Sequence, residues 1–535
     1  MEGTGGELDY TPLLNWPPLA GGLPDCTSWL LGAMLFLAGY LLLQHLWNFH
    51  RAVSRNVPPG PRPWPILGNF LFLLLPGLVG KGSSLESRRR TFLFPHIVLN
   101  DLAQIYGNVF SLFIGSRLLV ILSNFETVKE ALVTHADVFS DRPNLAMVIH
   151  VTQQKGIVFA PYGSVWRQQR KFSHSALRHF GLGQLSLEAK VIEEFKYVKE
   201  EMLKHGRGSV NPFPIISNAV SNIICSISFG KRFDYEDKEF KTTLKLMSRG
   251  LELGMNSCAI LINLCSWLYY LPVGPFKELG HAITEIRSFL KRIIAEHKDT
   301  LTAGNPRDFI DMYLLHVEDE KAMNKSSFND EYLLYIISDL FVAGTDTTTN
   351  TILWSLLYMS LYPDVQEKVQ AEIDAVIGRD RPPSLTDKAL MPFTEATIME
   401  VQRMTTVVPL SVPHMASETT VFQGYTIPKG SVIIPNLWSV HRDPKIWENP
   451  DDFYPDRFLD GTGHILKKEA FIPFGIGRRV CMGEQLAKME LFLMFANLLQ
   501  SFTFALSDET SKPSLKGRFG LTLAPFPFNV NISSR

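Results

Sequence analysis

The chain has only five cysteines among its 535 residues, and no two of them are spaced as a Cys-x-x-Cys pair. This scarcity argues against a disulfide framework and gives no sign of a zinc site. An isolated cysteine is usually a small buried hydrophobic residue, and we expect that of Cys26, Cys225, Cys258 and Cys265. Cys481 is the exception, because its neighbours favour a reactive role.

The chain also lacks an excess of charge of either sign. Its 52 Lys and Arg residues balance 53 Asp and Glu residues without a basic tract, which argues against nucleic acid as a partner. It has no Gly-x-Gly-x-x-Gly dinucleotide-binding pattern, so NADPH is not expected to bind it. Since no repeat or linker interrupts the middle of the sequence, we predict one large catalytic domain with an N-terminal appendage.

Charged residues are missing from the stretch Cys26–His50, which is rich in leucine. A bilayer core requires about 20 apolar residues in a helix, and Trp29, Tyr40 and Trp47 lie where interface aromatics are found. We therefore predict a transmembrane anchor at residues 27–49. A buried core helix is the alternative interpretation, and the acidic residues before the run disfavour a cleaved signal peptide.

The orientation of this anchor follows from the distribution of arginine. Arg51, Arg55 and Arg62 follow the apolar run, and no Lys or Arg precedes it. The positive-inside rule then makes residues 1–26 a short lumenal segment and puts the catalytic domain in the cytosol. An acid-poor, Arg-rich start typical of a mitochondrial presequence is absent.

Residues 50–65 form a basic, proline-rich hinge, and prolines make such a stretch stiff and extended. The catalytic domain is predicted at 66–535. Residues 71–92 combine an apolar patch with charged residues, and a second contact with the membrane surface is one interpretation. The apolar stretch Cys258–Leu271 is too short to span a bilayer; it is either a loop that dips into the membrane or a buried helix.

Helical periodicity dominates the middle of the chain, from about residue 185 to 361. Short β-type runs lie on either side of it, so we predict a mainly α protein with minor β structure. The predicted helices are Ser186–Lys204, Ala282–Lys298 and Tyr332–Leu361, and the predicted strands lie at Val109–Ile114, Leu118–Leu122 and within Val421–Ile434.

The most specific motif is the decapeptide Phe474-Gly-Ile-Gly-Arg-Arg-Val-Cys-Met-Gly483. Its glycines let the backbone approach a flat ligand closely, and backbone N–H groups can then face the Cys481 sulfur. Arg479 can pair with a carboxylate. An apolar helix predicted to start near Ala487 directs its N-terminus toward the sulfur, which favours the thiolate. The motif predicts that Cys481 is a thiolate metal ligand.

This motif resembles the signature Phe-x-x-Gly-x-Arg-x-Cys-x-Gly of the cytochrome P450 superfamily. Every fixed position is met, by Phe474, Gly477, Arg479, Cys481 and Gly483. The resemblance implies the cytochrome P450 fold and haem b as the cofactor, with Cys481 as the axial iron ligand. It also implies that Phe474, Arg479 and Gly483 contribute to haem binding.

Glu400, Arg403 and Arg457 match the structural triad of that superfamily, and by this resemblance they form a buried network. Glu400 and Arg403 lie three residues apart, on one face of a helix. Taken alone, the pair would be an ordinary surface ion pair of small energy.

The segment Ala343-Gly-Thr-Asp-Thr-Thr348 lies inside an apolar helical pattern. Glycine and β-branched threonine are weak helix formers, so we expect the helical hydrogen bonds to open here, as they often do at functional sites. A helix with threonines bonded back to its own carbonyls is the alternative. The resemblance implies that Ala343 and Gly344 leave room for O2 and that Asp346 and Thr347 relay protons.

Three further residues match haem-propionate donors of the superfamily. Trp166 and Arg170, four residues apart on one helix face, correspond to one such pair. His414 corresponds to a donor in mammalian-type members, although a lone histidine is more often structural. Segments expected by the resemblance to line the substrate pocket are 144–158, 251–262, 341–347, 407–412 and 519–521.

The proline-rich hinge and Asn222–Gly230 resemble microsomal family 2, and the long N-terminus with residues 71–92 resembles subfamily U, a group associated with long-chain fatty-acid hydroxylation. The resemblance implies an endoplasmic reticulum membrane enzyme, with an additional mitochondrial pool, that takes electrons from NADPH–cytochrome P450 reductase and, as a second donor, cytochrome b5. Arachidonic acid, hydroxylated at or near its terminal carbon, exemplifies the expected substrate. Open alternatives are a monooxygenase of steroids or xenobiotics, a haem-thiolate isomerase or peroxygenase, and a non-catalytic haem sensor.

Overall fold

The computed structural model describes residues 26–53, 56–64, 68–69, 94–180, 185–204, 208–254, 257–302, 304–322, 327–507 and 513–535. Helices dominate this part of the chain, and strands are few and short, as the sequence predicts. The predicted lumenal segment before Cys26 and residues 71–92 lie outside the described residues.

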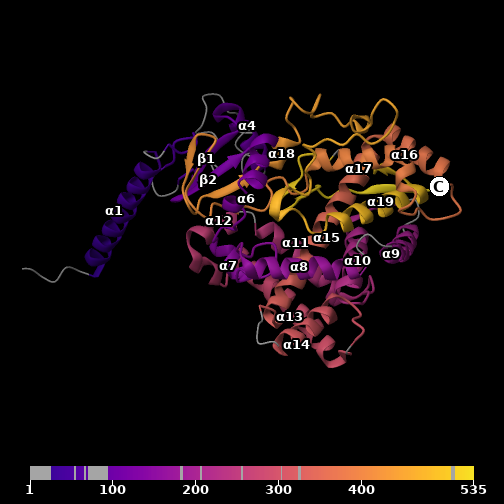
Figure 1. The fold of residues 1–535 in the computed structure, drawn as a ribbon, viewed down its shortest axis with the longest axis horizontal. Coiled ribbons are helices and arrows are strands. Elements are labelled where there is room, and N and C mark those ends of the chain that lie inside the picture. Colours follow the sequence, from indigo (N-terminus) through magenta and orange to yellow (C-terminus); the bar gives the residue numbers. More distant parts are fainter. Residues whose placement is uncertain are drawn as a thin grey trace, which may run out of the picture.

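The helix α15 (Asp330–Leu361) is the central element of the body (Figure 1). The Asn329 side chain caps its first turn by accepting a hydrogen bond from the Tyr332 backbone N–H, and Asp330 and Glu331 complement its dipole there. Side chains on every side of its last three turns are buried, as expected of a helix inside a core.

Long helices surround α15, and it packs against α10, α13, α17 and α19. All three predicted long helices are confirmed; two have ends within two residues of the expected limits, and the third, predicted from Ala282, begins eight residues earlier at Gly274. The long helices besides α15 are α4 (Pro95–Tyr106), α8 (Ser164–His179), α9 (Leu185–Lys204), α10 (Phe213–Ser228), α11 (Lys238–Leu253), α13 (Gly274–Thr300), α14 (Phe309–Ala322), α16 (Pro363–Val376), α17 (Pro392–Thr405) and α19 (Glu484–Ser501).

Shorter helices connect these elements. They are α5 (Phe125–Lys129), η2 (Glu130–Thr134), α6 (Ala136–Phe139), α7 (Ala146–Thr152), α12 (Ser257–Leu264), η3 (Ser266–Tyr270), η4 (Lys388–Leu390), α18 (Leu437–Val440), η5 (Pro455–Phe458) and η6 (Gly477–Arg479).

The largest sheet has the strand order β1-β2-β7-β4. Gly115, with a φ of 60°, makes the tight turn of the β1–β2 hairpin, where Ile114 pairs with Arg117. The strands are β1 (Val109–Ile114), β2 (Arg117–Leu122), β7 (Val432–Pro435) and β4 (His414–Met415), and the smaller sheets are β3 (Ser209–Val210) with β11 (Val530–Ser534) and β8 (Phe502–Leu506), β5 (Thr420–Phe422) with β6 (Tyr425–Ile427), and β9 (Arg518–Phe519) with β10 (Leu523–Ala524).

An N-terminal helix, α1 (Cys26–Val53), covers the predicted anchor and stands away from the rest of the fold (Figure 1). Its apolar side chains are exposed on all sides, including Leu30, Met34 and Phe36. No helix in the described part of the chain is both long enough and apolar enough to count as a candidate membrane span.

Part of the proline-rich hinge is bonded to β1. The Ser111 N–H and hydroxyl donate to the carbonyls of Pro59 and Pro58, each over 2.7 Å. A Cβ on Gly60 would lie 2.0 Å from the Ser111 carbonyl oxygen, so only glycine fits at this contact. The hinge is therefore fixed to the sheet at these residues.

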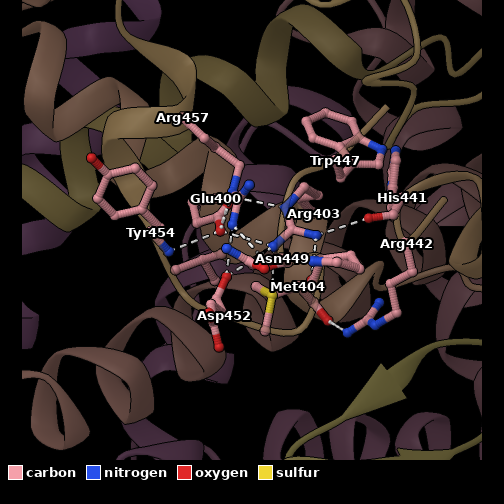
Figure 2. A network of polar contacts seen from close by, with 12 residues as sticks. Glu400, Arg403, Met404, His441, Arg442, Trp447, Asn449, Asp452, Tyr454 and Arg457 are labelled. Carbon is pink, nitrogen blue, oxygen red and sulfur yellow. Dashed lines mark hydrogen bonds and ion pairs between the residues drawn. The ribbon is translucent and has the colours of Figure 1, made fainter. Parts of the chain in front are cut away.

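Glu400 on α17 joins two arginines in a buried network (Figure 2). Its carboxylate accepts hydrogen bonds from Arg403 at 2.8 Å and from Arg457 at 2.8 Å, and from the Tyr454 backbone N–H at 3.0 Å. Arg403 also donates to the carbonyls of His441 and Pro450. The network predicted from the sequence is confirmed, and it connects α17 to the loop that precedes the Cys481 motif.

We expect Glu400→Gln to destabilise the fold by about 3–5 kcal/mol, because Arg403 and Arg457 would be left buried without an anion. Urea denaturation followed by circular dichroism measures the loss. The matched control is Glu395→Gln on the same helix, whose ion pair with Lys388 is partly exposed and contributes about 0–1 kcal/mol. Equal effects of the two substitutions would contradict a special role for the Glu400 network.

Candidate active site

The Cys481 loop is held in a tight conformation by two glycines. Gly475 and Gly477 have φ values of 72° and 81°, which other residues rarely adopt. A Cβ on Gly477 would lie 2.1 Å from the Leu132 carbonyl oxygen in η2, so this glycine also allows the loop to pack on η2. The Cys481 N–H donates to the Phe474 carbonyl at 3.0 Å and closes the loop.

Cys481 is an exposed residue, but many protein atoms lie around its thiol and keep part of the solvent away from it. Burial raises the pKa of its thiol, while the Gly483 backbone N–H and the nearby Arg170 lower it. Helix α19 begins at Glu484, close enough for its dipole to favour the thiolate. Since burial prevails, a bound metal cation is the partner that would deprotonate this thiol fully. The donor groups fit a thiolate-ligated iron.

Three arginine side chains gather beside Cys481: Arg142, Arg170 and Arg479. Burial lowers the pKa of all three, to about 10 for Arg479. No carboxylate in the described part of the chain forms an ion pair with any of them, although Asp141 is near enough to raise the pKa of Arg142 and Arg479. Buried guanidinium groups require anions, so the cluster fits the two carboxylates of a haem.

Arg142 is a member of this cluster that the sequence did not predict. It is 5% exposed and donates to the carbonyls of Val158, Val412 and Pro413 at 2.8–2.9 Å. The contacts with Val412 and Pro413 join segments about 270 residues apart in the sequence. Arg142 belongs to no short motif of fixed spacing, so the sequence alone offered no signal for it.

The structure brings Trp166 and Arg479 together with Arg170. The Arg479 guanidinium lies 4.1 Å from the Trp166 ring centroid and that of Arg170 lies 5.3 Å from it. The Trp166 indole N–H and Arg479 both donate to the Ile157 carbonyl. Donation by Trp166 to a propionate, as predicted, would require an exchange of this bond, because indole has a single N–H.

His414 is buried next to the same cluster. Its Nδ1 lies 2.7 Å from the Phe139 carbonyl, and since a carbonyl only accepts, Nδ1 carries the hydrogen. Burial and the charge of Arg142 lower the pKa of His414 well below its usual value. The neutral ring therefore has an acceptor at Nε2, and His414 would donate to a propionate from Nε2 only after gaining a proton.

The predicted opening of the helix at 343–348 is wrong, because α15 continues without a break through these residues. The Thr347 hydroxyl donates to the Ala343 carbonyl at 2.7 Å, and Thr351 and Ser355 repeat this bond one and two turns later. The alternative interpretation, threonines bonded back to the helix, is the one the structure supports. Ala343 is exposed in the middle of this buried helix, so its methyl group faces an open space.

Gly344 does not leave free space. A Cβ at Gly344 would lie 2.6 Å from the Ile224 Cδ1 on α10, so the space that glycine provides is filled by Ile224. The missing side chain lets α10 and α15 pack closely. This corrects the expectation that Gly344 makes room for O2, which now rests on Ala343.

Asp346 lies beside Thr347 in sequence but is bonded elsewhere. Its carboxylate accepts hydrogen bonds from the Thr522 hydroxyl and from Asn350 at 3.1 Å. Burial raises its pKa, and the Thr522 bond lowers it. Thr522 lies in the β9–β10 turn, one residue past the predicted pocket segment, and no pattern in the sequence predicts this contact.

An apolar cavity of about 340 Å³ lies in front of α15. Four of the five predicted pocket segments contribute to its lining, and residues 407–412 do not, although the neighbouring Pro413 does. Representative lining residues are Leu145, Leu251, Val342 and Leu521. Because Val342 precedes Ala343 on α15, the cavity reaches the helix segment that carries Thr347.

Comparison with known proteins agrees with this site. A family model described as Cytochrome P450 matches residues 58–532. The chain is 64% identical to cytochrome P450 2U1 of Homo sapiens over 511 residues, 94% of each chain. It is 61% identical to cytochrome P450 2U1 of Rattus norvegicus over 528 residues, 97% of this chain and 98% of the relative. Cytochrome P450 2D26 of Mus musculus is 41% identical over 504 residues, 93% of this chain and 97% of the relative.

The chain belongs to the cytochrome P450 family. It is a haem-thiolate monooxygenase, and its similarity to the 2U1 proteins confirms the predicted family 2, subfamily U. The roles of the individual residues remain predictions, with Cys481 as the iron ligand.

We expect Arg142→Gln to weaken haem retention about tenfold, or ~1.5 kcal/mol, through the loss of a charge-assisted hydrogen bond to a propionate. The rate of haem transfer to an acceptor apoprotein measures this. Arg478→Gln is the control, since this exposed neighbour pairs with Asp137 on the surface. Unchanged transfer from the Arg142 variant would contradict its assignment to the haem site.

Proposed function

We propose that this monooxygenase hydroxylates long-chain fatty acids, such as arachidonic acid, at or near the terminal carbon. The observation that carries the proposal is the apolar cavity that reaches α15 at Val342. Its lining suits a long hydrocarbon chain. The choice of fatty acids over steroids or xenobiotics rests on the similarity to the 2U1 proteins and on what that resemblance implies.

The haem, when bound, supplies the oxygen chemistry, and the chain supplies the ligand, the protons and the pocket. The Thr347 hydroxyl gives its hydrogen to the Ala343 carbonyl, so its oxygen is free to accept a further hydrogen bond. Asp346 holds a proton more readily than a free carboxyl because burial raises its pKa. To pass a proton to Thr347, the Asp346 carboxyl must first break its hydrogen bond with the Thr522 hydroxyl.

Electrons come from a separate protein in this proposal, since the sequence has no dinucleotide-binding pattern. NADPH–cytochrome P450 reductase is the proposed donor, with cytochrome b5 as a second one. Their proposed docking face is the Cys481 side of the haem.

Membrane attachment is also part of the proposal. The apolar side chains exposed around α1 have no counterpart on an ordinary soluble helix. Trp267 and Tyr270 in η3 are 63% and 72% exposed, whereas Cys258 and Ile262 in α12 are buried. This mixture supports α12 and η3 as a surface element that touches lipid. The proposed location is the endoplasmic reticulum membrane facing the cytosol, with an additional mitochondrial pool.

The substrate proposal is tested by mass spectrometry of products formed from a lipid mixture with reductase and NADPH. We expect hydroxylated long-chain fatty acids. Hydroxylated steroids alone would replace the fatty-acid proposal. Turnover that requires only a hydroperoxide would favour the peroxygenase or isomerase alternative, and binding of haem and ligand without any turnover would favour a sensor.

We expect Thr347→Ala to lower the yield of product per NADPH by about tenfold, the lower end of what one positioned proton-transfer group contributes. Product and NADPH consumption are measured in the same reaction. Thr351→Ala is the control, because its hydroxyl makes the same kind of bond, to the Thr347 carbonyl at 2.8 Å. If the two variants remain equally coupled, Thr347 has no part in proton delivery.

A further inference from the structure

Two arginines, Arg117 and Arg287, line the largely apolar cavity, and Arg287 does so from α13. Arg287 is half-buried on this helix and takes part in the cavity wall beside Ile283, Ile286 and Val151. A guanidinium group surrounded by apolar side chains loses hydration, so it binds an anion strongly if one enters.

The protein fixes this side chain with only part of its hydrogen-bonding capacity. Its Nη2 donates to the carbonyls of His150 and Val151, at 3.1 Å and 2.7 Å, and its guanidinium lies 5.5 Å from the Tyr335 ring centroid. Within the described residues, its Nε and Nη1 have no acceptor. The guanidinium is therefore held in place, and the three N–H groups of its Nε and Nη1 are left for a ligand.

No acid of the described chain forms an ion pair with Arg287. The two carboxylates nearby, Asp330 and Glu331, are bonded to Lys298 and Lys155. These two acids line an outer pocket of about 440 Å³ together with Arg287, Lys291 and Lys298. That pocket therefore has three cations to two anions, and Arg287 stands where it meets the apolar cavity.

The position of Arg287 also suits a long ligand. Its contact, Tyr335, precedes Ala343 by eight residues on α15, which is roughly 12 Å along the helix at about 1.5 Å per residue. An anionic head group at Arg287 would place its hydrocarbon chain, and not the head group itself, beside Ala343 and Thr347.

We infer that Arg287 is the carboxylate-binding residue of this cavity and that it holds the head group of the fatty acid whose chain lies along α15. This inference rests on the proposed function and deepens it. Arg287 determines which carbons reach the haem, and it gives free acids an advantage over neutral lipids of the same chain.

The test uses the full-length holoenzyme with arachidonic acid and its methyl ester as probes. Arg287→Gln should raise the Kd of the acid roughly tenfold to a hundredfold, as expected for a lost charge-assisted contact, and leave that of the ester unchanged. The Kd values come from spectral titration and, independently of the haem, from equilibrium dialysis with radiolabelled lipid. Arg287→Lys should restore part of the affinity, and the site of hydroxylation should spread along the chain in the Gln variant.

Arg117→Gln is the matched control, because Arg117 also lines the cavity but bonds the Asn144 carbonyl from the end of β2. If this variant, and not Arg287→Gln, loses the preference for the acid, the inference is overturned. Equal affinity of the unaltered enzyme for acid and ester, or equal loss of both in Arg287→Gln, also overturns it. The spectrum of the reduced carbon monoxide complex verifies that each variant retains thiolate-ligated haem.

If the unaltered enzyme forms no hydroxylated fatty acid, the proposed function fails instead. The ratio of the acid and ester Kd values then still decides whether Arg287 binds carboxylates.

Discussion

Buried positive charge is the constraint on which this structure depends. The charges of Arg403 and Arg457 are compensated within the chain, because Glu400 and several backbone carbonyls accept hydrogen bonds from their guanidinium groups. The charge of the arginines beside Cys481 is not compensated in this way, because the described chain supplies only carbonyls and the nearby Asp141, which forms no ion pair with them. The first group stabilises the fold by itself, and we propose that the haem carboxylates complete the second. In that proposal, binding of the cofactor also stabilises the region around Cys481 by electrostatics.

The sequence predicted those features that depend on spacing along the chain. In the decapeptide around Cys481, the Glu400–Arg403 pair and the long helices, the spacing between the informative residues is set by helix or loop geometry. Contacts between distant segments had no such signal. Arg142 touches Val412, Gly344 meets Ile224, and each of these contacts exists only after the chain has folded.

The misjudged helix at 343–348 has a physical explanation. Weak helix propensity costs little in a helix that is buried along most of its length, since packing determines its conformation. The hydroxyls of threonine then add a bond to carbonyls that already accept one from the backbone. The role proposed for this segment rests on the exposed Ala343 methyl group and the orientation of the Thr347 hydroxyl, and it does not need a distorted backbone.

The hydrogen bonds between Ser111 and the hinge prolines limit how far the catalytic domain can move relative to helix α1. Helix α1 ends at Val53 and the docked segment starts at Pro58, so the connection can reach at most roughly 18 Å at ~3.6 Å per residue. A body held this closely keeps one side turned toward whatever surface α1 occupies. If α1 lies in a membrane and the substrate is a lipid, as proposed, the lipid enters the enzyme by a short lateral step and does not pass through bulk water.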